Sequence, residues 1–273
     1  MKTVRTRLRK IWPLDMARHW RNREIERFYR RFGFIPIGET LEQDIFVCGF
    51  PKSGNTWVQN LLASLIFGLE PRYLTDQLVQ AIVPDVHQAK FYKRFFEPCF
   101  FKTHHTIRQE YRRVVHLVRD PRDVAVSFYH FDKARGRNTD LDAKVELVID
   151  GWRRHSQGYI NNHTGAATMH VRYEDLLKQP ESEVQRLTEF AGLERSQAIR
   201  SRTVEGNCFL AIKRRETKFG IANSKWPSEV AFFRQGKSGA FSDTLSKHNI
   251  LRIEDQLGDL MRHFDYAPDR PDS

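Results

Sequence analysis

The stretch GFPKSGNTW, at 49–57, joins a short apolar run to a helical pattern. The apolar run, IFVCGF at 45–50, is typical of a buried strand. Trp57, Leu61 and Leu65 then recur with the spacing of one helix face. A strand, a glycine turn and a helix in this order favour an anion site, because backbone N–H groups of the turn and of the helix N-terminus point at the ligand. The unit therefore predicts an α/β fold that binds a phosphate-like group.

The cation of this loop stands at an unusual place. A phosphate-binding P-loop reads G-x-x-x-x-G-K-[ST], with its lysine on the β and γ phosphates and its hydroxyl on magnesium. Gly49, Gly54 and Thr56 fit that pattern. Asn55 replaces the lysine, and Lys52 supplies the charge from inside the turn. Because the cation lies earlier in the loop, we expect a ligand whose negative charge around the α-phosphate position is arranged differently from that of a P-loop nucleotide. A chance glycine turn is the alternative, and the flanking strand and helix argue against it.

The rest of the chain alternates between strand and helix patterns. Further strands are expected at 99–103, 114–118 and 169–173, and helices at 120–131, 141–160, 181–191 and 244–264. This alternation is typical of a parallel sheet with helices on both faces. We therefore expect one α/β domain at 41–265, with a central parallel β-sheet flanked by helices and a P-loop-like phosphate-binding loop. An N-terminal segment at 1–40 precedes it, and a frayed tail at 266–273 follows it. The basic stretch 213–241 is interpreted as a long loop.

Most of the net charge of +11 lies at the N-terminus. Residues 1–31 hold eleven Lys/Arg and three acidic residues, which leaves a net charge of +8. Their apolar residues recur with helical spacing and predict a basic amphipathic helix: Trp12, Met16, Trp20, Ile25, Phe28, Tyr29 and Phe32. We expect this helix to pack its apolar face on the domain, with an anionic membrane surface or nucleic acid as the alternatives. Because the other residues are only weakly basic, no nucleic-acid partner is expected.

Localisation is predicted from segments that the sequence lacks. No apolar run reaches the roughly 18 residues of a membrane-spanning helix, and no apolar stretch marks a secretory signal. Cys48, Cys99 and Cys208 are far apart and match no zinc spacing. We expect a cytoplasmic protein, with peripheral membrane contact through 1–31 as an option. The oligomeric state stays open.

Two further motifs place charged side chains at strand ends. In FFKTHH, at 100–105, Lys102 and His104 point the same way in an extended chain, which suits charge stabilisation and proton transfer. A surface Lys-x-His without a function is the alternative. In RDPRDVAVSFYHF, at 119–131, Arg119 and Ser127 suit a second phosphate. An arginine paired with a neighbouring aspartate is the alternative there.

Five motifs occur in an order that resembles the cytosolic-type sulfotransferases: PKSGNTW, FKTHH, RDPRDVAVSFYHF, RYEDL and RQGKSG, over roughly 45–240. That family transfers a sulfonate from 3′-phosphoadenosine 5′-phosphosulfate (PAPS). The resemblance implies a PAPS-dependent sulfotransferase that moves the sulfonate in line to a hydroxyl, or to an amine, of an acceptor. Because PAPS carries a 5′-phosphosulfate and a separate 3′-phosphate, it requires neither a γ-phosphate lysine nor a metal.

The resemblance also implies roles for single residues. Lys52, Ser53, Gly54, Asn55 and Thr56 would wrap the 5′-phosphosulfate; Arg119, Ser127, Arg234, Gln235 and Gly236 would hold the 3′-phosphate; Trp57, Tyr173 and Phe209 would contact the adenine. His104 would be the general base for the acceptor hydroxyl. Lys52 and Lys102 would stabilise the negative charge on the transferred group and on the leaving oxygen. The implied catalytic set is therefore His104, Lys52, Lys102 and Ser127.

The last motif departs from the family pattern. Gln235 stands where the family commonly has lysine, and Ala240 and Phe241 stand where it has Asp-Trp. The missing cation predicts donor binding weakened by roughly tenfold or more. Lys237 and Lys213 are the residues that would compensate.

The acceptor is not identified by the sequence. A small-molecule, glycan or lipid-linked hydroxyl fits the family equally. A run of rings forms either an acceptor wall or ordinary core: Phe91, Tyr92, Phe95, Phe96, Phe100 and Phe101. Two other functions remain open. One is a kinase-like P-loop protein, which requires a lysine at position 55, and the other is a nucleotide-binding module without sulfonate transfer.

Overall fold

The computed structural model describes residues 12–221, 226–227 and 229–266. Its centre is a four-stranded sheet in the order β4-β2-β5-β6, and every neighbouring pair is parallel. The strands are β2 (Ile45–Gly49), β4 (Phe100–Thr103), β5 (Arg113–Val118) and β6 (Ala167–Arg172). The predicted α/β domain with a central parallel sheet is confirmed, and these four strands lie close to the positions expected from their apolar runs.

Alternate residues of β2 enter different parts of the core. Ile45 and Val47 pack with α2 (Asn55–Phe67), whereas Phe46 and Cys48 pack on the opposite face of the sheet. This alternation follows from the period of two in an extended strand. Both faces of the strand are therefore buried, which explains its continuous apolar run.

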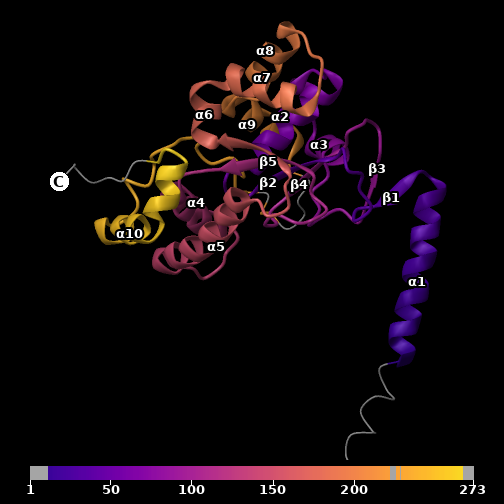
Figure 1. The fold of residues 1–273 in the computed structure, drawn as a ribbon, viewed down its shortest axis with the longest axis horizontal. Coiled ribbons are helices and arrows are strands. Elements are labelled where there is room, and N and C mark those ends of the chain that lie inside the picture. The colour runs from indigo at the N-terminus through magenta and orange to yellow at the C-terminus, as the bar shows by residue number, and fades with distance from the viewer. Residues whose placement is uncertain (1–11, 222–225, 228, 267–273) are drawn as a thin grey trace, which may run out of the picture.

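Helices cover both faces of the sheet (Figure 1). One face carries α2 with α3 (Asp76–Ile82), α6 (Tyr173–Lys178), α7 (Pro180–Ala191) and α8 (Gln197–Gly206); the other carries α4 (Pro121–Ala134), α5 (Leu141–Asn161) and α10 (Lys247–His263). The four helices expected after 120 correspond to α4, α5, α7 and α10. The start of α4 follows local chemistry, because Asp120 accepts the N–H of Arg122 and Pro121 takes the first helical position.

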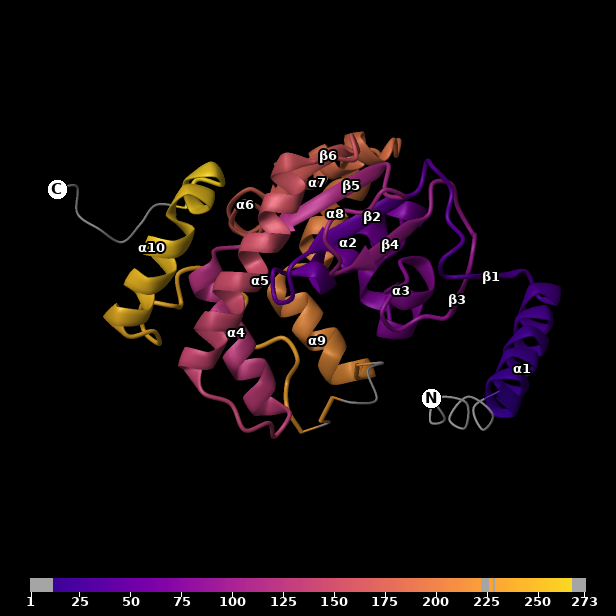
Figure 2. The ribbon, with the colours of Figure 1, turned by 60° about the horizontal axis from the view of Figure 1, so that its bottom comes forward.

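The N-terminal helix, α1 (Trp12–Arg31), projects from the domain (Figures 1 and 2). It leads into β1 (Phe34–Pro36), which pairs antiparallel with β3 (Phe91–Lys93) in a separate two-stranded sheet. Sequence patterns missed both of these strands because each has only three residues. A short 3-10 helix, η1 (Pro71–Tyr73), follows α2.

The expectation that α1 packs its apolar face on the domain is wrong for three of its four described apolar side chains, whereas the fourth, Tyr29, stacks on Phe91. Ile25, Phe28 and Phe32 are exposed by 41%, 58% and 58%. Residues 1–11, and the side chains of Trp12, Met16 and Trp20, lie outside the part of the chain that the structure describes. No helix among the described residues is long and apolar enough to cross a bilayer.

The predicted loop at 213–241 begins as a helix, α9 (Phe209–Phe219). Arg215 is buried and donates to the Oδ1 atoms of Asn60 (2.9 Å) and Asn207 (2.8 Å). Burial lowers its pKa to about 10. The prediction failed because a run of basic residues was taken as a solvated surface, whereas one of them is the helix's anchor in the core.

The C-terminal boundary also moves by one residue. Tyr266 was expected to begin the frayed tail, but it is buried and its hydroxyl donates to Oε2 of Glu174 at 2.7 Å. Residues 267–273 of the predicted tail lie outside the described chain. The three cysteines are free thiols, and of these only Cys208 is exposed.

Two glycines of α5 provide a matched test of this packing. A Cβ on Gly151 would lie 2.6 Å from Cε2 of Phe50, whose ring is also held between Phe128 and His155. We expect Gly151→Ala to lower the free energy of unfolding by about 1–3 kcal/mol through overpacking.

Gly158→Ala is the control, because its Cβ would meet only ordinary contacts at 3.9 Å. It should raise the free energy of unfolding by about 0.4–1 kcal/mol, since alanine favours the helix. Urea unfolding monitored by circular dichroism measures both values. Equal effects of the two substitutions would contradict the packing of Phe50 against α5.

Candidate active site

The glycine loop is closed by the residue that replaces the P-loop lysine. The side chain of Asn55 is buried, and its Nδ2 donates to the carbonyl oxygens of Gly49 (3.3 Å) and Phe50 (3.2 Å). A Cβ on Gly49 would lie 2.4 Å from Oδ1 of Asn55, so the loop requires glycine there. Asn55 thus holds the loop in shape, a role that its position in the sequence did not reveal.

Left-handed backbone conformations turn the loop into α2. Lys52 has φ 75°, which is uncommon for a residue with a side chain. Gly54 has φ 100°, and a Cβ there would meet the ring of Tyr173 at 2.6 Å. As the N-cap of α2, Gly54 offers no side-chain cap to the first N–H groups of the helix. Ser53 lies fully buried beside them, and its Oγ has no partner among the described residues. Unpaired donors at the N-terminus of a helix are suited to hold an anion.

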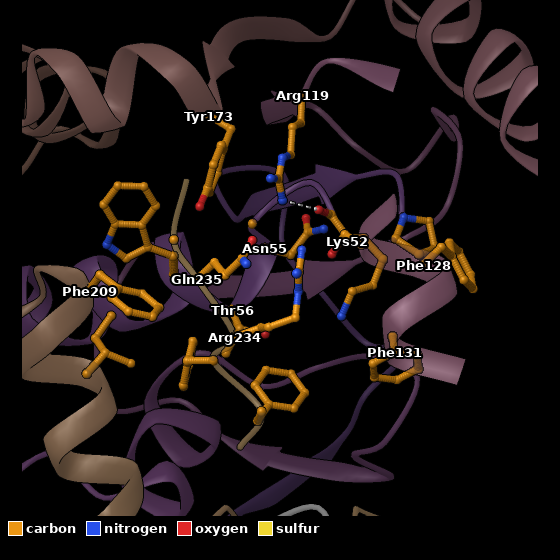
Figure 3. Close-up of a pocket in the computed structure, with 18 of the residues that line it drawn as sticks. Lys52, Asn55, Thr56, Arg119, Phe128, Phe131, Tyr173, Phe209, Arg234 and Gln235 are labelled. Atoms are coloured by element: carbon orange, nitrogen blue, oxygen red, sulfur yellow. Dashed lines mark hydrogen bonds between the residues drawn. The ribbon is translucent and has the colours of Figure 1, made fainter. Parts of the chain in front are cut away.

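A cavity of about 390 Å³ opens next to this loop (Figure 3). The expected site residues that line it are Lys52, Gly54, Asn55, Thr56, Trp57, Lys102, His104, Arg119, Ser127, Tyr173, Phe209, Arg234, Gln235 and Gly236. Ser53 lies in the loop behind the lining. The structure therefore brings together residues that are spread over more than half of the chain.

Positive charge is crowded in the cavity. The Nζ of Lys52 lies 4.0 Å from the ring centroid of Phe131. Burial, together with the positive charges of Arg119 and Lys102, lowers the pKa of Lys52 to about 7. An anion placed in the cavity would raise that pKa again. The lysine is thus in an environment that favours an anionic ligand.

Arg119 satisfies its guanidinium with backbone oxygens. It donates to the carbonyls of Lys52 (3.3 Å) and Lys237 (2.9 Å), and it lies 4.2 Å from the ring centroid of Tyr173. Its Nε is buried and finds no partner among the residues that the structure describes. The alternative of a paired aspartate is also met, because Nη2 of Arg119 forms an ion pair with Oδ2 of Asp123 at 3.7 Å, but this pair leaves Nε unsatisfied. Arg119 therefore keeps donor capacity for a ligand.

The loop of Arg234, Gln235 and Gly236 closes one side of the cavity. Figure 3 shows Arg234 and Gln235 pointing into it. Gly236 has φ 60°, and a Cβ there would lie 2.3 Å from the ring of Phe209. The oxygens of Asp123 anchor the following residues by accepting from the N–H groups of Gly239 (2.8 Å) and Phe241 (3.1 Å). Of the two cations expected to replace the missing lysine, Lys237 lines the cavity and Lys213 does not.

The proposed base is oriented by the phosphate loop. The Nδ1 of His104 lies 2.8 Å from the carbonyl oxygen of Gly49. A carbonyl oxygen only accepts, so Nδ1 carries the proton and Nε2 keeps its lone pair. Burial lowers the pKa of His104 to about 4, and the charge of Lys102 lowers it in the same direction. The imidazole is therefore neutral over the physiological range.

Sequence patterns missed a short segment that supports Lys102 and His104. Asp85 lies 2.9 Å from Nζ of Lys102, and its other oxygen accepts the N–H of His87 at 2.9 Å. Gln88 donates to the same carboxylate at 3.0 Å. The Nε2 of His87 accepts the backbone N–H of His104 at 3.0 Å. All three new residues line the cavity, and the acid–x–histidine pair at 85–87 was the available signal.

The aromatic walls come from another part of the chain than expected. None of the rings between 91 and 101 lines the cavity; Tyr92, Phe100 and Phe101 are buried in the core. The lining rings are Phe128, Phe131, Phe232 and Phe233, together with Trp57, Tyr173 and Phe209. Of the two interpretations of the run at 91–101, ordinary core is confirmed for Tyr92, Phe100 and Phe101, and no ring of 91–101 forms an acceptor wall at this cavity.

The charges around His104 predict how its pKa responds to substitution. Lys102→Met removes a positive charge and should raise the pKa, whereas Asp85→Asn removes a negative charge and should lower it. Nuclear magnetic resonance of the ring protons measures both shifts. In the native protein the ring should not titrate between about pH 5.5 and pH 8, and a midpoint near the usual value of about 6.5 would contradict the buried geometry.

Comparisons with known proteins show the family of the chain. The sequence model described as "Sulfotransferase domain" matches residues 42–265. Sulfotransferase 1A1 of Bos taurus is 26% identical over 254 residues, which cover 81% of this chain and 84% of the relative. Cytosolic sulfotransferase 1 of Danio rerio is 27% identical over 234 residues, which cover 72% of this chain and 75% of the relative.

Solved structures share the fold. Mouse sulfotransferase SULT7A1, determined with PAP (adenosine 3′,5′-bisphosphate), superposes with a TM-score of 0.62 at 17% identity. The match covers 83% of this chain and 87% of the mouse chain. Retinol dehydratase, determined with retinol and PAP, superposes with a TM-score of 0.63 at 20% identity. The match covers 85% of this chain and 84% of the dehydratase chain. The family match spans most of the chain, including the phosphate loop and the cavity residues, so the chain belongs to the sulfotransferase family, whose members catalyse sulfonate transfer.

Proposed function

We propose that this sulfotransferase uses PAPS as the donor and transfers its sulfonate to a hydroxyl, or to an amine, with His104 as the general base. One observation carries the proposal. Five Lys/Arg residues and a single acidic residue, Asp85, are among the described residues that line the cavity, and Asp85 is already paired with Lys102. This excess of positive charge favours a ligand with several negative groups, as in a phosphosulfate with a second phosphate.

Unsatisfied donors mark where the donor's anionic groups would bind. The Oγ of Ser53 and the free N–H groups of the loop and of Thr56 would hold the 5′-phosphosulfate together with Lys52. The Nε of Arg119 would bind the 3′-phosphate, assisted by Ser127, Arg234 and the backbone of Gly236. The rings of Trp57, Tyr173 and Phe209 would enclose the adenine. The unpaired Ser53 and Arg119 atoms support this fit, because buried polar groups normally have partners.

Gln235 is accommodated in this arrangement. It adds a neutral amide, rather than another cation, beside Arg234 and within the same cavity as Lys52 and Arg119. Lys237 supplies a further positive charge at the rim. We therefore expect Gln235 to weaken the hold on the 3′-phosphate without abolishing it.

The residues around His104 suit proton removal from the acceptor. PAPS supplies a sulfonate bonded to a phosphate oxygen, which is the leaving group. Nε2 of His104 would take the proton of the acceptor hydroxyl as the acceptor oxygen forms its bond to sulfur and the bond from sulfur to the phosphate oxygen breaks. Lys52 and Lys102 would stabilise the negative charge that grows on the leaving oxygen. Preorganised cations of this kind typically contribute roughly 10²–10³ in rate.

The wall of four phenylalanines supports an acceptor with an apolar body. Phe128, Phe131, Phe232 and Phe233 line the cavity. One related structure was determined with androsterone and another with retinol, both of which are apolar alcohols. We propose a small-molecule alcohol or phenol acceptor that is sulfonated in the cytoplasm, with glycans and lipid-linked hydroxyls as the alternatives for an acceptor screen.

A kinase-like reaction is disfavoured by the role of Asn55. A P-loop kinase needs a lysine at this position to reach the β and γ phosphates. Here the amide closes the loop on Gly49 and Phe50. A non-catalytic nucleotide-binding module would not require the lone pair on His104, and turnover distinguishes it.

Ligand selectivity is the first prediction of the proposal. Calorimetric titration should show strong preference for adenosine 3′,5′-bisphosphate (PAP) over ADP and over Mg-ATP, because two separate phosphates match Ser53 and Arg119. Equal affinities, or a preference for Mg-ATP, would contradict the donor assignment.

The same titration should detect proton uptake. The pKa of Lys52 is about 7 before binding, and bound phosphate raises it. At about pH 8 the amine is therefore mostly neutral before binding and gains a proton on binding, so affinity falls as pH rises above about 7. Buffers with different ionisation enthalpies measure the uptake. Lys52→Met should abolish it and weaken binding; uptake that persists in this variant would exclude Lys52 as its source.

Turnover tests the general base. His104→Ala should lower the rate of sulfonate transfer by roughly 10²–10⁴-fold, because the base is lost. PAP affinity should change little, since the proposed phosphate contacts are made by Lys52, Ser53 and Arg119 rather than by His104. His163→Ala, at an exposed histidine after α5, is the matched control. Near-native turnover of His104→Ala would show that another group takes the proton.

A further inference from the structure

The described part of α1 exposes a continuous apolar strip. The strip consists of Ile25, Phe28 and Phe32, which share one side of the chain at spacings of three and four residues. The rings of Phe28 and Phe32 lie 5.1 Å apart between centroids. Isolated exposed hydrophobic residues are common, but adjacent rings on one projecting helix indicate a binding surface.

Tyr29 fastens the helix and thereby leaves the strip outside. Its ring stacks on Phe91 of β3 at 4.5 Å and meets Phe34 of β1 edge-on at 5.5 Å. The rest of α1 extends away from the domain (Figures 1 and 2). The strip is thus presented on an arm whose base is attached to the two-stranded sheet.

The arm is strongly basic. Between 21 and 31 there are five arginines and two glutamates. Glu24 pairs with Arg27 and Glu26 pairs with Arg30, each at 2.8 Å, so the acids are neutralised within the helix. Residues 1–20 add six Lys/Arg and one acidic residue. At 3.6 residues per turn, Arg23, Arg27 and Arg30 lie on the side of the helix opposite the strip, whereas Arg21 lies on the strip's own side. Arginines opposite exposed apolar residues are typical of helices that lie in a lipid headgroup region.

The base of the arm is linked to the His104 end of the cavity. β1 pairs with β3, and the N–H of Ile37 donates to the carbonyl of Lys90 at 3.0 Å. Lys90 lies two residues after Gln88, in the segment whose Asp85, His87 and Gln88 line the cavity. The arm and the proposed acceptor end are therefore attached to the same short stretch of chain.

We propose that α1 docks this enzyme on the surface of anionic phospholipid bilayers. Ile25, Phe28 and Phe32 insert at the boundary of headgroups and acyl chains, and the arginines contact lipid phosphates. Charge selects lipid over a second copy of the chain, because two arms with the same net positive charge repel each other. As a consequence that rests on the proposed function, docking would hold the His104 end of the cavity near hydroxyl groups carried by lipids.

Vesicle co-sedimentation of the full chain tests the docking. Vesicles of phosphatidylcholine with about 30% phosphatidylglycerol should bind the protein at least about tenfold more strongly than pure phosphatidylcholine, and about 0.5 M NaCl should weaken this binding. Phe28→Ser with Phe32→Ser should reduce it by about tenfold or more, because inserted apolar area is lost. Arg21→Gln with Arg23→Gln should reduce vesicle binding and make the remaining binding less sensitive to NaCl.

Tyr73→Ser with Leu147→Ser is the matched control, since both residues are exposed hydrophobics far from α1 in the chain. Unchanged thermal unfolding and PAP affinity in every variant would show that folding and the donor site are intact, so that docking and the proposed function are tested separately. Equal binding to both vesicle types, or no loss in the Phe28/Phe32 variant, overturns the proposal. Sedimentation velocity that shows a dimer broken by the same variant, without vesicle binding, would assign the strip to a second copy instead.

Discussion

The carbonyl oxygen of Gly49 joins the two functional parts of the cavity. It lies at the end of β2 and meets Nδ1 of His104 at 2.8 Å and Nδ2 of Asn55 at 3.3 Å. The first contact determines the tautomer of the histidine, and the second closes the phosphate loop. Because a Cβ on Gly49 would collide with Asn55, only glycine permits both contacts. One backbone atom therefore sets the shape of the anion site and the direction of the proposed base.

Around this atom, each buried cation is compensated in a different way. Lys102 pairs with Asp85, Arg119 donates to backbone carbonyls, and Lys52 lies over the ring of Phe131 with a lowered pKa. Buried charge is costly unless it is paired and hydrogen-bonded, so these contacts keep the cavity stable before a ligand binds. The compensation of Lys52 and Arg119 is incomplete, and this is why the cavity favours an anion with two separated charges.

Much of the fold and of the site was predictable because the signals were local. Four apolar runs predicted the four strands, and Asp120 with Pro121 predicted the start of α4. The loop residues, Lys102 and His104 were singled out by their spacing and lie together at the cavity, and the order of the motifs indicated the family. The failures had a common physical cause. Arg215 was interpreted by its residue type, whereas its burial depends on neighbours distant in sequence. Asp85 and His87 carried no periodic pattern and were missed.

The sequence by itself determined the first strand, the glycine loop and the helix that follows it, because glycine conformations, apolar periods and helix caps act over a few residues. Only the tertiary structure decided which partners these groups meet. The parallel register of β2 and β4, in which Cys48 faces Thr103, brings Gly49 beside His104. An isolated β-bridge between separate segments places Asp85 beside Lys102. Phe128 and Phe131 line the same cavity as Phe232 and Phe233, which lie about a hundred residues later in the chain. Such contacts depend on how strands and helices pack across the whole chain, and local sequence does not encode that geometry on its own.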